Sequence, residues 1–207
     1  SQLAVSGTLN VGYFGSGNTL TIRNGADMTG TGKACIGFGD ITYSTASAIG
    51  GPFRLKDQNG QVVDSAALKG KPYAIFFGFT HCPEICPTTM ADMAALMAKL
   101  GPEAKDFKIY FVSVDPERDT PDVLRGYLAS FEPHVVGLTG SPDEIARVAK
   151  EFRVYYRKVP LDGGDYTMDH SAFVYLMGKD GGFRSVIGYQ EKPDRALDKL
   201  KTLIEKG

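Results

Sequence analysis

The sequence of 207 residues predicts an α/β domain whose central sheet is covered by helices. Two nearly continuous apolar runs, at residues 73–79 and 107–114, support this prediction, because a strand that is apolar on both faces is buried on both faces. The third observation is that segments with helical spacing and helix start signals follow these runs. We therefore expect strands at the centre of a sheet, with helices on its faces.

The segment after the first run predicts a helix over residues 87–100, ended by Gly101. Its apolar residues recur at helical spacing, namely Met90, Met93, Met97 and Leu100. A second helix is expected from Pro121 to about residue 131, and a third opens at Ser141. Both starts combine a capping residue with a proline in the first turn, which is typical of helix N-termini.

The remaining signals complete the domain at both of its ends. Asn59 and Gly60 separate two short apolar stretches and predict a hairpin, since both residues tolerate a positive φ. Near the C-terminus, strands at 172–177 and 183–189 precede a last helix that runs from Pro193 to about residue 205. The resulting order of β-α-β-α-α-β-β-α, with two cysteines where the first central strand meets its helix, describes a thioredoxin-like domain.

Residues 1–46 form an extension rich in Gly, Ser, Thr and Asn, which we separate from the domain at 47–207. A short apolar stretch at 9–13 is echoed at 34–38, a spacing typical of solenoid repeats. The stretch 17–27 resembles a passenger repeat of autotransporter proteins. One or two such units are too few to fold alone, so a fusion remnant or a poorly ordered extension is the alternative.

Composition excludes several classes of partner. A net charge of -1 provides no electrostatic footprint for nucleic acid or for an anionic membrane surface, so neither partner is expected. No run approaches the roughly 20 apolar residues that span a bilayer, which predicts a soluble chain. Because the sequence starts at Ser1, a preceding signal sequence or membrane anchor stays open. Three cysteines are too few for a disulfide scaffold.

The strongest local pattern is the pair Cys82 and Cys86 at the start of the first predicted helix. Two cysteines four positions apart can bring both sulfurs onto one side of a helix N-terminus. Free backbone N–H groups and the helix dipole favour thiolate over thiol there. Pro87 fits the first helical position, where its missing N–H has no partner to lose. The pair is therefore expected to ionise.

Paired thiolates serve either as a redox dithiol or as soft ligands for monovalent copper, zinc or iron–sulfur clusters. An iron–sulfur cluster takes about four cysteines and a structural zinc site four ligands, whereas this chain has three cysteines. Monovalent copper accepts two or three ligands, so it becomes the leading metal if one more donor lies nearby. Two buried cysteines that meet by chance are the alternative.

His170 is the histidine expected to complete the site. It stands immediately before the first strand of the C-terminal hairpin, and in thioredoxin-like folds the loop at this place packs against the cysteine-bearing helix start. Clusters of cysteine and histidine mark metal sites, so Cys82, Cys86 and His170 are the predicted ligands. His81 is expected to point away from the pair, and His134 to be a solvated surface residue.

Three stretches taken together resemble the Sco/SenC family. They are residues 76–88 with both cysteines, residues 112–121, and residues 169–171 with the histidine. The similarity runs from about Gly50 to Ile204. In this resemblance the ligand cysteines and the ligand histidine of the family fall on the three predicted ligands of this chain.

The resemblance implies a thioredoxin-like copper protein that binds one copper ion, Cu(I) or Cu(II), through Cys82, Cys86 and His170. It implies a role in delivering copper to the CuA centre of cytochrome c oxidase, with the copper-accepting subunit or another copper chaperone as partner. The family faces the periplasm or the mitochondrial intermembrane space and is held by one N-terminal transmembrane helix, which implies an inner-membrane anchor. This chain has the glycine-rich extension at that place, which leaves the anchoring open.

Two acids are candidates to support the ligands. Asp169 is placed to accept the second N–H of the His170 ring, as carboxylates beside metal-bound histidines often do, with a turn-forming role as the alternative. Asp115 ends the second central strand, at the sheet edge where α/β proteins place their sites, with turn capping beside Pro116 as the alternative. Cys35 lies in the extension and is expected to be inert.

The rival function is a thiol–disulfide oxidoreductase in which Cys82 and Cys86 form a redox disulfide and keep the cysteines of the acceptor reduced. Three residues rather than two separate the cysteines, the chain has no tryptophan, and His170 occupies the usual proline loop, all of which favour the copper carrier. A peroxiredoxin would place a threonine three residues before the first cysteine, where this chain has Phe79. A transferable copper site is also a dithiol when empty, so both leading functions stay open.

Overall fold

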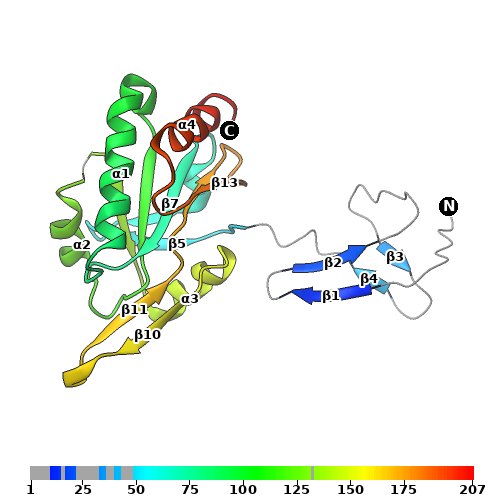
Figure 1. The fold of residues 1–207 in the computed structure, drawn as a ribbon, viewed down its shortest axis with the longest axis horizontal. Coiled ribbons are helices and arrows are strands. Elements are labelled where there is room, and N and C mark those ends of the chain that lie inside the picture. The colour runs from blue at the N-terminus through cyan, green and yellow to red at the C-terminus, as the bar shows by residue number, and fades with distance from the viewer. Residues whose placement is uncertain (1–9, 15–16, 22–32, 36–39, 43–48, 132) are drawn as a thin grey trace. The chain divides into compact units, whose positions relative to one another are not determined.

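The computed structural model divides the chain into two compact units, Ser1–Ala48 and Ile49–Gly207 (Figure 1). The residues that it describes are 10–14, 17–21, 33–35, 40–42, 49–131 and 133–207. The predicted site residues all belong to the second unit.

Two short hairpins are described in the first unit. They are formed by β1 (Asn10–Phe14) with β2 (Gly17–Thr21), and by β3 (Lys33–Cys35) with β4 (Asp40–Thr42). Of the stretch compared with an autotransporter repeat, residues 22–27 lie outside the described residues, as does the change of composition near Ala46. The separation of an extension at 1–46 from the domain at 47–207 therefore stays a prediction.

A seven-stranded mixed sheet forms the centre of the second unit, in the order β13-β12-β7-β8-β9-β5-β6. Its strands are β5 (Arg54–Asp57), β6 (Val62–Asp64), β7 (Tyr73–Gly78), β8 (Lys108–Ser113), β9 (Val135–Thr139), β12 (Val174–Met177) and β13 (Phe183–Ile187). β7, β8 and β9 run parallel, and the other pairs are antiparallel. Every residue of β7 is buried, as its uninterrupted apolar sequence predicts.

Four α-helices flank this sheet. They are α1 (Ile85–Leu100), α2 (Pro121–Leu128), α3 (Pro142–Glu151) and α4 (Pro193–Lys206). The helix starts follow the sequence signals: Thr120 caps α2 and Ser141 caps α3, each with proline in the first turn. At the end of α1, Gly101 has a φ of 56°. Three short 3₁₀ helices lie at Ser65–Leu68, Gly101–Ala104 and Asp162–Gly164.

Different helices cover the two faces of the sheet. Successive strand residues point to opposite faces, so the neighbours Phe76 and Phe77 show what packs on each one. On one face, Phe76 contacts Phe111, which in turn contacts Tyr127 of α2. On the other face, Phe77 contacts Phe152, which directly follows α3. α1 and α4 pack against each other, and α4 also packs on β12 and β13. These layers confirm the expected α/β architecture.

The structure adds three strands to the predicted order. β9 lies between β8 and β5 in the main sheet. β10 (Tyr156–Pro160) and β11 (Tyr166–His170) pair with each other as a separate two-stranded sheet, which we call the arm. His170 therefore ends a strand instead of lying in a loop, which corrects the expectation for its backbone. The arm projects below the sheet in Figure 1.

Candidate metal centre

The cysteine pair lies where β7 is linked to α1, with Cys82 in the connecting turn and Cys86 in the first turn of the helix. Gly78 ends β7, and a Cβ at this position would lie 2.9 Å from Sγ of Cys86 and 2.8 Å from the Phe76 ring. Glycine therefore lets the first turn of α1 approach the sheet. α1 begins at Ile85, two residues earlier than predicted, so Pro87 is its third residue and still lies among the N–H groups that lack intrahelical partners.

A sulfur atom caps the start of α1. The side chain of Glu84, at the N-cap position, makes no capping hydrogen bond. Instead the backbone N–H of Cys86 donates to Sγ of Cys82 at 3.3 Å. Both sulfurs are thereby held at the positive end of the helix dipole, where thiolate is favoured.

A buried carboxylate that sequence reasoning did not single out anchors the turn. Asp119, which is fully buried, accepts the Thr80 hydroxyl at 2.6 Å, the Thr80 N–H at 3.0 Å and the Ser113 hydroxyl at 2.6 Å. Burial raises the pKa of Asp119, against these hydrogen bonds. In the sequence Asp119 is only a residue beside a helix start; the structure shows that Thr120 caps α2, which leaves the Asp119 carboxylate available for these contacts.

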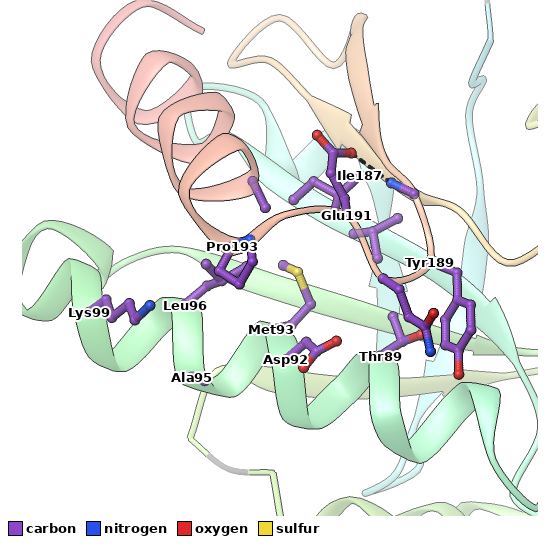
Figure 2. A pocket seen from close by; sticks show the side chains of 14 residues that line it. Thr89, Asp92, Met93, Ala95, Leu96, Lys99, Ile187, Tyr189, Glu191 and Pro193 are labelled. Atoms are coloured by element: carbon purple, nitrogen blue, oxygen red, sulfur yellow. Dashed lines mark hydrogen bonds between the residues drawn. The ribbon is translucent and has the colours of Figure 1, made fainter.

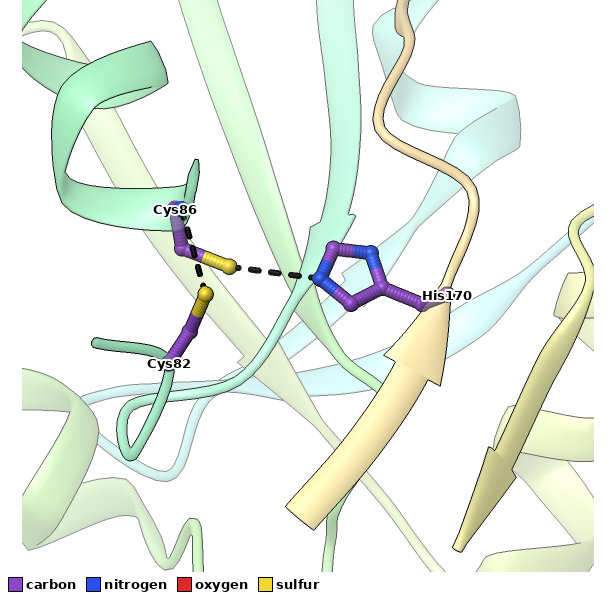
Figure 3. A group of neighbouring side chains, drawn as sticks. All are labelled: Cys82, Cys86 and His170. Atoms are coloured by element: carbon purple, nitrogen blue, oxygen red, sulfur yellow. Dashed lines mark hydrogen bonds between the residues drawn. The ribbon is translucent and has the colours of Figure 1, made fainter. Parts of the chain in front are cut away.

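His170 approaches the pair from the end of β11 (Figure 3). Its Nε2 lies 3.5 Å from Sγ of Cys86, and its Nδ1 lies 3.0 Å from the carbonyl oxygen of Ser171. Donation from Nδ1–H to this carbonyl directs the lone pair of Nε2 toward the sulfurs. Edge-to-face contacts with Phe76 and Phe79 hold the ring in place.

The donor atoms of Cys82, Cys86 and His170 all lie within 4.8 Å of one another. Two sulfurs and one imidazole nitrogen form a donor set that suits copper. The cysteines are buried free thiols and the histidine is half-buried, so the site is largely shielded from water. The geometry thus brings together all three residues that the sequence predicts as ligands.

The pKa values of the two cysteines are shifted in opposite directions. A hydrogen bond from the Cys86 side chain lowers the pKa of Cys82 to about 4, against the opposing effect of burial. The same bond and burial raise the pKa of Cys86. The lowered pKa of Cys82 and the raised pKa of Cys86 therefore favour a thiolate at Cys82 and a thiol at Cys86 at neutral pH.

The expected role of Asp169 is wrong. The Ser171 carbonyl takes the ring N–H that was assigned to this carboxylate. Asp169 is exposed and lies 3.8 Å from Arg157. The reason is that Asp169 and His170 are successive residues of one strand, so their side chains point to opposite faces.

Asp115 contacts neither cysteine nor histidine directly, and its side chain does not cap the adjacent turn. Its carboxylate accepts hydrogen bonds from Arg118 and from the Tyr166 hydroxyl. Asp115 therefore bonds to the strand that carries His170 rather than to the ligand itself.

The other histidines lie outside the metal-binding group. His81 is exposed, and its Nδ1 lies 3.2 Å from the Thr80 hydroxyl. His134 is half-buried, with Nδ1 3.1 Å from the Phe107 carbonyl oxygen, and is not the fully solvated residue expected from the sequence.

A pocket of about 130 Å³ lies between α1 and the segment that joins β13 to α4 (Figure 2). Its lining includes the apolar side chains of Met93, Leu96 and Ile187. Glu191 borders it but is engaged by Lys199 and by the backbone N–H of Gly188. None of the three soft donors lines this pocket, so its chemistry is separate from that of the metal centre.

Known proteins resemble the chain in sequence and in fold. A SCO2-like protein of Rickettsia felis is 40% identical over 161 residues, which cover 77% of this chain and 78% of the relative. A mitochondrial SCO1 homolog of Arabidopsis thaliana is 42% identical over 73% of this chain, which spans only 46% of that relative's length.

Among the described residues, no helix combines the length and apolar character that a bilayer crossing requires.

Solved structures of copper-bound relatives have the same fold. Bradyrhizobium japonicum ScoI with copper bound is 51% identical, with a TM-score of 0.71 over 75% of this chain and 99% of that chain. Arabidopsis thaliana ScoI with copper bound is 41% identical, with a TM-score of 0.72 over 77% of this chain and 100% of that chain. The sequence profile described as SCO1/SenC matches residues 41–205. Because this match spans most of the chain, and both cysteines and the histidine lie within it, the chain belongs to the SCO1/SenC family.

Proposed function

We propose that this protein is a copper chaperone that binds one copper ion through Cys82, Cys86 and His170 and takes part in assembly of the CuA centre of cytochrome c oxidase. The observation that carries the proposal is the convergence of two sulfurs and one imidazole nitrogen within 4.8 Å. Thiolates suit Cu(I), and imidazole suits both oxidation states, so the set accommodates Cu(I) and Cu(II). Membership of the SCO1/SenC family and likeness to copper-bound relatives support it.

The proposed partners are the copper-accepting subunit of the oxidase or another copper chaperone, reached at the periplasmic face of the inner membrane or in the mitochondrial intermembrane space. A relative described as mitochondrial supports the mitochondrial alternative. An anchored full-length form belongs to the same proposal. Transfer by ligand exchange fits a three-donor site, because an incoming cysteine of the acceptor can occupy an open position before a donor of this chain leaves.

Copper transfer to a metal-free CuA domain tests the chaperone function. We expect the protein loaded with one Cu(I) per chain to pass its copper to the acceptor, because three donors hold the ion less completely than a closed site does. Native mass spectrometry of both proteins measures the transfer, with a chelator of matched affinity as the control copper source. Copper that stays on this chain, or that reaches the acceptor no faster than from the chelator, contradicts the proposal.

The protonation of the cysteine pair makes copper affinity depend on pH. Between pH 7 and 8, Cys82 with its pKa of about 4 is already ionised, whereas the raised pKa of Cys86 keeps that thiol protonated. Binding of Cu(I) to both sulfurs should therefore release about one thiol proton, and affinity should rise about tenfold per pH unit. Competition titrations with a chelator of known pH dependence measure this slope. A rise of about a hundredfold per pH unit would mean that both thiols are protonated in the free protein.

The rival oxidoreductase function uses the same two sulfurs. The lowered pKa of Cys82 supplies the thiolate that attack on a disulfide requires. His170 separates the two functions, because copper binding uses its nitrogen and disulfide exchange needs only the sulfurs.

A further inference from the structure

The two halves of the candidate metal centre stand on different parts of the fold. Cys82 lies in the turn between β7 and α1 and Cys86 in the first turn of α1, whereas His170 is the last residue of the arm formed by β10 and β11. The arm is not a member of the seven-stranded sheet. The distance between imidazole and sulfur therefore depends on what attaches the arm to the domain.

A polar cluster of Asp115, Arg118 and Tyr166, which we call the clasp, makes this attachment. The Tyr166 hydroxyl donates to Oδ1 of Asp115 at 2.8 Å, and Arg118 donates from Nε to Oδ2 of the same carboxylate. Nη1 of Arg118 donates to the backbone carbonyl of Tyr166 at 2.9 Å. The guanidinium also stacks on the Tyr166 ring, 3.7 Å from its centroid. Asp115 and Arg118 belong to the domain, and Tyr166 begins β11.

Burial makes these contacts strong. Asp115 is only 1% exposed, so its charge is compensated by the clasp and not by water. Hydrogen bonds to an ionised and desolvated carboxylate are stronger than bonds between neutral groups, and the planar guanidinium can bind two acceptors at once. Farther out, a half-exposed pair between Lys158 of β10 and Glu117 adds a weaker contact.

Apolar packing alone does not fill the space beneath the arm. A cavity of about 240 Å³ lies between the arm and the domain, lined by Val114, Ile145, Tyr156 and Met168 among others. Met168 is buried, and an open pocket lies beside it at this edge of the arm. The clasp therefore acts at the Tyr166 end of β11, while Phe76 and Phe79 contact the ring at its His170 end.

One loop, residues 114–120, holds both halves of the centre. Its Asp119 binds Thr80 in the cysteine-bearing turn, and its Asp115 and Arg118 bind Tyr166 in the arm. Side chains alternate along β11, so Tyr166 points to the same side of the strand as His170. A change in the clasp is transmitted along this strand to the imidazole.

We infer that Asp115, Arg118 and Tyr166 are positioning residues that set the distance of His170 from the two sulfurs, and with it the retention of Cu(II). The part of this inference that concerns copper rests on the proposed function, whereas the part that concerns the position of the arm does not. Loss of the clasp should weaken the binding of Cu(II), which needs the imidazole. It should spare the binding of Cu(I), which the two thiolates hold.

The test uses two variants of the clasp. Tyr166→Phe removes the hydroxyl but keeps the ring, and Arg118→Lys keeps the charge but loses the planar guanidinium that binds two acceptors. Tyr155→Phe is the matched control, since it removes an exposed tyrosine hydroxyl next to the start of β10. In the metal-free protein, we expect amide hydrogen exchange in β10 and β11 to become about tenfold faster in both test variants, with exchange in α1 unchanged.

In the copper-loaded protein, the test variants should release Cu(II) about tenfold faster than wild type while still binding one Cu(I). Tyr155→Phe should match wild type in both measurements. Exchange and Cu(II) release that equal wild type in both test variants overturn the inference, as does faster exchange spread equally over α1. If His170→Ala leaves Cu(II) binding unchanged, the proposed ligand set fails instead, and the metal-free exchange then decides the role of the clasp alone.

Discussion

Replacing either cysteine of the pair should abolish tight binding of Cu(I). Structural zinc sites with four ligands bind with about 10–16 kcal/mol, so on that scale one lost ligand costs about 2.5–4 kcal/mol, or roughly a hundredfold to a thousandfold in affinity. Cys82→Ser keeps an oxygen that can accept the Cys86 N–H at the start of α1, and Cys86→Ala leaves a small void without a buried hydroxyl. Both variants should therefore remain folded while they lose copper.

Competition with a chelator measures the affinity, and thermal unfolding of the metal-free variants measures the fold. Cys35→Ser is the matched control, because Cys35 belongs to the other compact unit and is expected to be inert. We expect this control to bind one Cu(I) with wild-type affinity. Undiminished stoichiometric binding in Cys82→Ser or Cys86→Ala would remove that sulfur from the copper site.

His170→Ala should change Cu(II) binding much more than Cu(I) binding. Without the nitrogen that lies 3.5 Å from Sγ of Cys86, two thiolates still satisfy Cu(I), but Cu(II) loses the ligand best suited to it. On the same estimate per ligand, the affinity for Cu(II) should fall by a factor on the order of several hundred. The absorption band from thiolate-to-Cu(II) charge transfer should weaken in parallel, which visible titration measures.

His81→Ala is the matched control for this variant, since His81 is adjacent to Cys82 in the sequence but is not one of the three clustered donors, and its ring hydrogen-bonds the Thr80 hydroxyl. Reduction of a model disulfide by the metal-free protein should be nearly the same in wild type and His170→Ala, because exchange depends on the sulfurs. An unchanged copper spectrum in His170→Ala would exclude the imidazole from the site. Loss of disulfide reduction with an unchanged copper spectrum would favour the oxidoreductase.

Several parts of the fold could be predicted because they depend on neighbours in the sequence. Asn59 and Gly60 form the expected turn of the β5–β6 hairpin, and Ser141 forms the capping box with Glu144 at the start of α3. The strands that escaped prediction lack such local signals. β9 is short and contains Gly137, whose missing side chain lets α2 pack closely, while β10 and β11 carry exposed polar residues along a two-stranded arm.

The sequence by itself determined the sulfur half of the site. Cys82 and Cys86 lie four positions apart at a helix start, and the geometry of a helix N-terminus is enough to bring their sulfurs together and favour a thiolate. It also indicated that His170 is the third donor, through the place of this residue in the order of elements and the resemblance to the Sco/SenC family.

Only the tertiary structure decided what holds these groups in place. The support that Asp169 was expected to provide comes from the Ser171 carbonyl, and the anchor of the cysteine turn is Asp119, which is 39 residues away from Thr80. Tyr166 and Asp115 meet across 51 residues. Such contacts join segments that approach each other only when the sheet assembles, so no local pattern of residue types could specify them.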